Sequence, residues 1–270
     1  MAKPFRRILP GCALLALVII LAGCDISVGD GNFSMGFLSS KATDRWTRNY
    51  DLPAGGEIEI ANVNGVINVS EGGSRVEVKA ERIAKASSED AAKRLLASVE
   101  MREDAAPNHV RIEAKMPPGG GMRQSLEIRY DVRVPPGVGV KMETVNGKIL
   151  LTGLTGPAEA ETTNGGVSGT GLSGPVKAST VNGGVDLDVK AVAAEGIEMS
   201  AVNGGVRLNM PADAKADIDA SCTNGRVAVS GLKLETSENS SREVSGRLNG
   251  GGPRVRLETT NGGVKIGALQ

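Results

Sequence analysis

The sequence predicts an all-β protein folded as a parallel β-solenoid, in which stacked coils share one elongated core. The first observation is that seven Asn-Gly dipeptides each stand between two short apolar segments. Their asparagines are Asn64, Asn146, Asn164, Asn182, Asn203, Asn224 and Asn261. The second observation is the spacing, because the middle five lie 18, 18, 21 and 21 residues apart. A fixed period of about 20 residues is typical of stacked coils.

Each coil is expected to contribute two strands that face the same core. Before Asn146, Val140 and Met142 alternate with charged residues, and this period of two indicates a half-buried strand. After it, Ile149 and Leu151 begin a second alternation, three and five residues on. The inward parity slips by one residue at Asn-Gly, so we expect a bend there rather than a continuous strand.

The asparagines themselves are expected to form a structural ladder at the corners. Glycine adopts positive φ without steric cost, and asparagine tolerates it better than most residues. We expect these side chains to stack, largely buried, with their amides hydrogen-bonded from coil to coil, because an unpartnered buried amide costs roughly a few kcal/mol. The alternative interpretation is that each Asn-Gly is a two-residue hairpin turn, which would give an antiparallel meander.

An insertion of about residues 83–139 interrupts the repeat between the first two corners. It is expected to hold one helix, at 87–101, which Ser87 or Ser88 would cap. Strands in and beside the insertion are expected at 74–82, 109–115 and 125–134. Because the terminal coil of a solenoid exposes its core, we expect the helix or its flanking strands to cover the N-terminal end.

A second interruption, of about residues 232–252, precedes the last corner. Residues 235–243 are rich in Ser and Glu and indicate an exposed loop. The chain is expected to return as a strand at 244–248 and to enter the last coil after Gly250–Pro253.

The first residues are typical of a secretory signal. Basic Lys3, Arg6 and Arg7 precede an apolar run that is too short for a spanning helix. The run ends in Leu21-Ala22-Gly23-Cys24, which resembles the lipobox of bacterial lipoproteins. The resemblance implies that residues 1–23 are removed and that Cys24 is acylated, with palmitate among its lipids.

The resulting organisation is a flexible tether of residues 24–44 and a single solenoid domain of residues 45–270. Asp25 resembles the inner-membrane retention signal of enteric lipoproteins. We therefore expect a lipid-anchored protein of the bacterial cell envelope that faces the periplasm or the exterior.

Charge and cysteine content restrict the partners and the chemistry. Of 31 basic residues three leave with the signal, so 28 remain against 31 acidic ones, about −3. Nucleic-acid-binding proteins carry a basic excess instead. Cys222 is the only other cysteine of the mature chain, so no intramolecular disulfide is expected. It occupies a position that Thr or Ala fills in other coils, which predicts a small buried side chain.

No catalytic cluster, metal site or cofactor motif is expected. The one histidine, His109, lies outside the regular coils and is interpreted as a solvated strand residue. Asp186 and Asp188 share a strand face, but the next coil offers Arg207 and Asn209 there rather than further carboxylates. A Ca²⁺ site needs six to eight oxygen ligands.

The pattern of strand, Val-Asn-Gly and strand resembles the putative-adhesin family of bacterial envelope proteins, a domain of unknown function. The resemblance rests on Leu52 to Gly65, Tyr130 to Gly137, Val145-Asn146-Gly147 and Gly250 to Gly263. It covers about 220 residues and implies a right-handed β-solenoid. It supplies no established ligand and no catalytic residue.

The function expected from these features is that of a non-enzymatic envelope lipoprotein whose solenoid surface binds, adheres or scaffolds. Its partner would be the membrane, through the lipid, and an unknown envelope protein or glycan. Two alternatives remain: a polysaccharide-active β-helix enzyme, and a scaffold that self-assembles through its open sheet edges.

Overall fold

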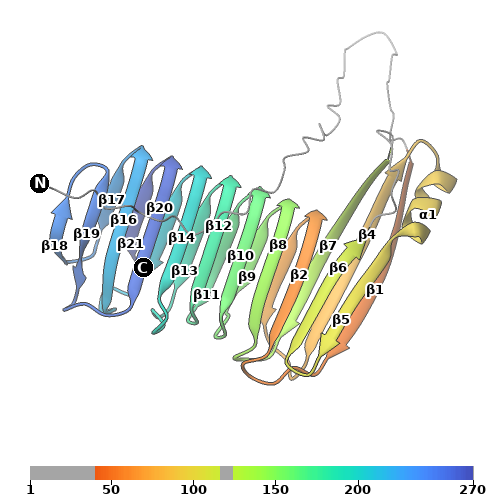
Figure 1. Cartoon of the computed structure of the whole chain (residues 1–270), viewed down its shortest axis with the longest axis horizontal. Helices are drawn as coiled ribbons and strands as arrows, with labels where there is room; N and C mark the ends of the chain where they lie inside the picture. The colour runs from red at the N-terminus through yellow and green to blue at the C-terminus, as the bar shows by residue number, and fades with distance from the viewer. Residues whose placement is uncertain (1–39, 116–123, 270) are drawn as a thin grey trace, which may run out of the picture. The chain divides into compact units, whose positions relative to one another are not determined.

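The computed structural model describes residues 40–115 and 124–269. These residues form two β-sheets that face each other across an apolar core, with one helix at the N-terminal end of the stack (Figure 1). The expected solenoid is confirmed, because successive coils place one strand in each sheet.

The first sheet has ten strands and the second has eleven. In spatial order the first holds β1 (Ser40–Tyr50), β4 (Val76–Ala86), β7 (Gln124–Val134), β3 (Ile67–Glu71), β9 (Ile149–Thr152), β11 (Val167–Leu172), β13 (Val185–Val189), β15 (Val206–Met210), β21 (Val264–Ala268) and β17 (Val227–Ser230). The second holds β18 (Leu234–Asn239), β19 (Glu243–Leu248), β16 (Ala216–Asn224), β20 (Arg254–Asn261), β14 (Ile197–Asn203), β12 (Val176–Asn182), β10 (Ala158–Asn164), β8 (Gly139–Asn146), β2 (Glu57–Asn64), β6 (His109–Lys115) and β5 (Glu100–Ala106).

The strands that meet at Asn-Gly corners pair in parallel with the equivalent strands of neighbouring coils. Asn164 lies opposite Asn146 on one side and Asn182 on the other, and Ala160 lies opposite Met142 and Ala178. A meander of hairpins would pair each strand antiparallel with its neighbour in sequence. The parallel register therefore excludes the hairpin interpretation of the Asn-Gly corners.

The spatial order of the coils differs from their sequence order at both ends of the stack. Strands β6 and β7 form a coil that stacks outside the first coil, β2 and β3. At the other end, the last coil, β20 and β21, inserts between β14/β15 and β16/β17. Coils with the same inward pattern are interchangeable for the core, so the apolar periodicity alone does not reveal these two inversions.

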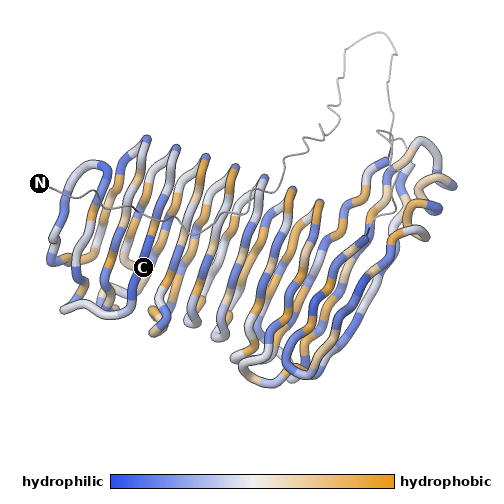
Figure 2. The backbone as a smooth tube through the Cα atoms, in the orientation of Figure 1, coloured by the Kyte–Doolittle hydropathy of each residue, from blue (hydrophilic) through white to orange (hydrophobic). Residues whose placement is uncertain are grey.

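The core is made mainly of aliphatic side chains, which alternate with polar ones along most strands (Figure 2). Tyr130 is the only aromatic residue that is fully buried among those described. The last inward position before each corner carries a buried Thr in several coils, and the hydroxyl of Thr180 donates to the carbonyl oxygen of Gly165 at 2.8 Å. Cys222 occupies the same slot and is 7% exposed.

Helix α1 (Glu89–Ser98) covers the N-terminal end of the core. Ser88 caps it by accepting a hydrogen bond from the backbone N–H of Ala91, and Ala92, Leu95 and Leu96 are buried. The helix is shorter than the expected 87–101 because Val99 is already extended and Glu100 starts β5, which pairs with β6.

Two further expectations need correction. Strand β1 begins at Ser40, inside the expected tether, because it pairs with β4 along its whole length up to Ser40 and Ala86. Residues 235–239, expected in a loop, belong to strand β18, which extends the second sheet by pairing antiparallel with β19. Their polar side chains remain exposed on this edge strand, which is why the sequence resembles a loop.

The signal peptide, Cys24, Asp25 and most of the tether lie outside the described residues. Within the described ranges, no helix has both the length and the apolar character needed to span a bilayer.

Candidate functional site: the asparagine ladder, the charge ladder and the groove

The structure brings all seven corner asparagines into one column, which we call the asparagine ladder. Each side-chain amide donates to the side-chain oxygen of the next asparagine at 2.8–2.9 Å. All donors point the same way, from Asn224 through Asn261, Asn203, Asn182, Asn164 and Asn146 to Asn64. The amide of Asn64 then donates to the carbonyl oxygen of Leu126 at 3.2 Å.

The expectation that these asparagines are largely buried is wrong, because six of the seven are exposed and Asn64 is half-buried. The preceding position, such as Thr180, is the last one that points inward before the chain bends. The asparagine then lies at the rim of the stack, where water also reaches it. The ladder is therefore a satisfied polar surface rather than a buried network.

The corners also require glycine, because successive coils approach closely there. A Cβ on Gly204 would overlap the carbonyl oxygen of Gly183 in the next coil. Gly184, the residue after Gly183, has more room. A Cβ added there would lie 3.2 Å from its nearest atom, the carbonyl oxygen of Gly205.

Valines form an exposed row directly beside the asparagine ladder. Val63, Val145, Val181 and Val202 precede their asparagines and are 38–48% exposed. Thr fills the same position in the other three coils. Half-exposed β-branched residues are common on strands, so the row alone does not define a binding site.

The outward face of the second sheet carries a column of alternating charge, which we call the charge ladder. Its members lie opposite one another on adjacent strands, and their signs alternate without exception. In spatial order they are Asp104, Arg111, Glu59, Lys141, Glu159, Lys177, Glu198, Arg256 and Asp219. Opposite charges directly across a strand pair stabilise the sheet, and like charges destabilise it.

The alternation depends on the two inversions of coil order. Stacking in sequence order would place Arg111 beside Lys141 at one end and Glu198 beside Asp219 at the other. The observed order instead inserts Glu59 in the first pair and Arg256 in the second. The charges therefore alternate in the observed order of the coils, whereas stacking in sequence order would place like charges side by side.

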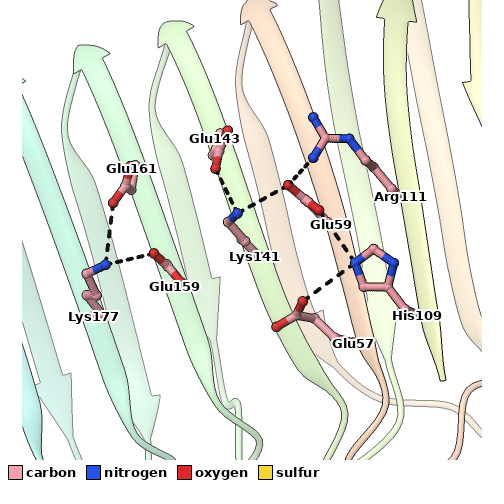
Figure 3. A network of polar contacts seen from close by, with 9 residues as sticks. All are labelled: Glu57, Glu59, His109, Arg111, Lys141, Glu143, Glu159, Glu161 and Lys177. Carbon is pink, nitrogen blue, oxygen red and sulfur yellow. Dashed lines mark hydrogen bonds and ion pairs between the residues drawn. The ribbon is translucent and has the colours of Figure 1, made fainter. Parts of the chain in front are cut away.

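Glu59 is the centre of the densest part of this ladder (Figure 3). Its side chain is 7% exposed and accepts from Arg111 Nη1 at 2.6 Å and from Lys141 Nζ at 3.3 Å. Lys141 also contacts Glu143 at 3.2 Å. In the next coils, Lys177 repeats this arrangement with Glu159 at 2.9 Å.

The protonation equilibria of these groups follow from the contacts. Burial raises the pKa of Glu59, but the hydrogen bonds and charges of Lys141 and Arg111 outweigh it, so the pKa lies below its usual value. The hydrogen bond to Glu143 raises the pKa of Lys141. Glu59 is therefore held as a carboxylate at neutral pH.

His109 lies beside this cluster on β6 rather than alone in solvent. Its Nε2 is 3.5 Å from Glu59 and 3.7 Å from Glu57, and its side chain is 42% exposed. Each contact becomes an ion pair only when the imidazole is protonated.

A shallow groove of about 350 Å³ follows the same face across neighbouring coils, close to where the strands of the second sheet begin. Its polar wall includes the ladder members Glu159, Lys177, Glu198 and Arg256. Its apolar wall includes Pro157 and Pro175, among other residues. None of the residues that line it is aromatic.

The two aspartates of β13 considered as metal ligands, Asp186 and Asp188, form contacts with the next coil instead. Asp186 pairs with Arg207 at 3.0 Å, and Asp188 accepts from the amide of Asn209 at 2.7 Å. No group of three or more His, Cys, Asp or Glu side chains is placed to hold a metal ion within residues 40–115 and 124–269.

The charge ladder and the groove were not predicted from the sequence, although a pattern of alternating charge in the sequence indicates the ladder. Five residues before the corner asparagines stand Glu59, Lys141, Glu159, Lys177 and Glu198, a run of alternating sign. The break in the alternation at Asp219 marks the point at which the last coil inserts. The groove left no comparable signal, because it forms from residues of several coils.

The fold defines the protein as a parallel β-solenoid, and a comparison with protein families identifies a matching family. Residues 139–267 match the family described as Toastrack DUF4097. The resemblance to a putative-adhesin family of unknown function is thereby confirmed.

Solved structures with a similar chain path include two from bacteria. One is a putative cell adhesion protein from Clostridium sporogenes, at 12% identity and a TM-score of 0.47, covering 84% of this chain and 100% of its own. Another is a putative adhesin from Bacteroides fragilis, at 12% identity and a TM-score of 0.38, covering 85% and 99%. No curated protein matches the chain significantly.

Proposed function

We propose that this chain is a lipid-anchored protein of the bacterial envelope that binds an extended partner on the outward face of the second sheet, without catalysing a reaction. The observation that carries the proposal is the groove along the charge ladder. Residues of several coils line it, and they include prolines and charges of both signs. Because the groove crosses neighbouring strands of the second sheet, it suits a strand-like or chain-like ligand better than a compact substrate.

The chemistry of the groove favours a polar partner with charges of both signs. Lys177 and Arg256 carry donors, whereas Glu159 and Glu198 carry acceptors, and the four lie opposite one another on adjacent strands. Sugar binding by ring stacking is disfavoured, since the lining holds no aromatic side chain. An envelope protein segment fits these requirements, and a charged glycan is the second possibility.

The alternative of polysaccharide hydrolysis has less support. A general acid for glycoside cleavage needs a carboxyl group whose pKa is raised. Glu59, the most buried carboxylate of this face, has a lowered pKa and is bound by two cations. Release of reducing ends from envelope polysaccharide by the purified protein would favour the enzyme instead.

The anchoring part of the proposal is tested by metabolic labelling with palmitate. The variant Cys24→Ser is expected to lose the label and to leave the membrane fraction, because it lacks the acceptor thiol. The matched control is Cys222→Ser, which changes a thiol in the folded core and is expected to keep both label and location. Equal labelling of the two variants would refute lipidation at Cys24.

A further inference from the structure

The last coil of the chain occupies a slot between two other coils. The slot is bounded by β14 and β15 on one side and by β16 and β17 on the other. We propose that this slot is an exchange site between two copies of this chain: the coil Arg254–Ala268 of each copy fills the slot of the other, which gives a coil-exchanged dimer.

The inserted coil is buried between its two neighbouring coils and hydrogen-bonded to both. Val255, Leu257, Val264 and Ile266 are at most 1% exposed, and they pack between coils that come earlier in the sequence. The backbone is bonded on both flanks. For example, Gly204 donates to the carbonyl oxygen of Asn261, and Gly262 donates to that of Asn224 on the opposite side. The same contacts form whether the coil comes from its own chain or from a second copy.

The charge ladder makes the slot selective for this coil. Arg256 lies between Glu198 and Asp219, and Asn261 completes the asparagine ladder between Asn203 and Asn224. If the coil left and the flanking coils closed directly, Glu198 would face Asp219. Like charges directly opposite are unfavourable, so an open slot is better filled by a second copy of the coil than closed.

The connection into the coil has the features of a hinge. Residues Asn249 to Pro253 carry the chain from β19, on the outside of β16, to β20 on its inside. Asn249, Gly250 and Gly251 all have positive φ, at 50°, 88° and 86°. Glycine changes its backbone conformation without steric cost, so Gly250 and Gly251 can extend toward a second copy. The side-chain amide of Asn249 donates to the carbonyl oxygens of Ala212 and Ala214 at 3.0 and 2.7 Å and holds the start of this connection.

Exchange of an identical element changes only the hinge and is therefore a low-cost route to dimers. The first sheet is less selective than the second, because Lys265 of the inserted coil lies opposite Arg207. The selectivity of the slot therefore resides in the second sheet.

The experiment uses two full-length chains, both with Cys222→Ala, that are co-expressed and purified from membranes. One chain carries Ser200→Cys and the other carries Glu258→Cys, since these residues lie directly opposite on β14 and β20. Exchange predicts a disulfide-linked heterodimer on a non-reducing gel. In the matched control, Ser179→Cys replaces Ser200→Cys; Ser179 lies on β12, one strand further away, so this pair is expected to remain monomeric.

A third chain that carries both Ser200→Cys and Glu258→Cys tests the geometry, because its two thiols should join within one molecule. The proposal is overturned if this chain closes internally while the co-expressed pair gives no more heterodimer than the control pair. The result is independent of which ligand the groove binds.

Discussion

Removal of one amide from the middle of the asparagine ladder provides a quantitative test of the corner. In Asn182→Ala, two hydrogen bonds of 2.9 Å are lost, one donated to Asn164 and one accepted from Asn203. A side-chain hydrogen bond contributes about 0.5–1.5 kcal/mol net, and water can reach this rim. We therefore expect the free energy of unfolding to fall by about 1–2 kcal/mol, near the lower part of the summed range.

The matched variant is Asn224→Ala, at the end of the ladder, where the side chain donates one hydrogen bond, to Asn261. Its expected loss is about half as large, about 0.5–1 kcal/mol. Both are measured by urea unfolding followed by circular dichroism, with the slope of the transition checked for equality. Equal losses in the two variants, or no loss in Asn182→Ala, would refute the reasoning that the ladder stabilises the stack through coil-to-coil amide bonds.

Two further predictions concern the charge ladder and the close approach at the corners. Glu59→Gln removes the carboxylate that neutralises two cations and should cost about 1–3 kcal/mol near pH 7. Glu161, whose side chain is 45% exposed and lies 3.8 Å from Lys177, is the control, and Glu161→Gln should change stability by less than about 0.5 kcal/mol. Because the folded pKa of Glu59 is lowered, its contribution is present above the unfolded pKa of about 4.3 and is lost as pH falls through the folded value. The difference in thermal midpoint between wild type and Glu59→Gln should therefore narrow below about pH 4, and a constant gap from pH 7 to pH 3 would contradict it. Gly204→Ala should destabilise by about 1–3 kcal/mol or more, because the added Cβ overlaps a backbone oxygen. Gly184→Ala should cost less, because its added Cβ lies 3.2 Å from the nearest oxygen. Equal stability of the two variants would count against the close approach of the coils at the corners.

The sequence was sufficient to predict the coils but not their order. The alternation around Asn146 recurs at every corner because each coil must bury the same face, and this determines strands, bends and parallel pairing. The core gives no preference between β16 and β20 as the neighbour of β14, since Ile218 and Val255 fill equivalent inward positions. The outward charges of the second sheet, such as Arg256, match the observed order, and a search for apolar periodicity ignores them.

The remaining differences have local causes. The asparagines share the parity of inward residues, so they were expected to be buried, but the bend at the corner places Asn182 at the rim. Helix α1 ends at Ser98 although Val99 to Met101 continue its pattern, because Glu100 and Met101 pair with β6 in the sheet. Strand β18 is an exposed edge strand whose polar residues look like a loop. In each case a tertiary contact overrides the local pattern.

The most direct test of the proposed binding function places a photoreactive residue on the outward face of the full-length protein in living cells. At position 198, in the groove, we predict a discrete crosslinked adduct with an envelope component. At position 228, on the exposed outward face of the first sheet, we predict none. Equal adducts at both positions, or no adduct at position 198, would contradict the proposal that this face of the solenoid is its binding surface.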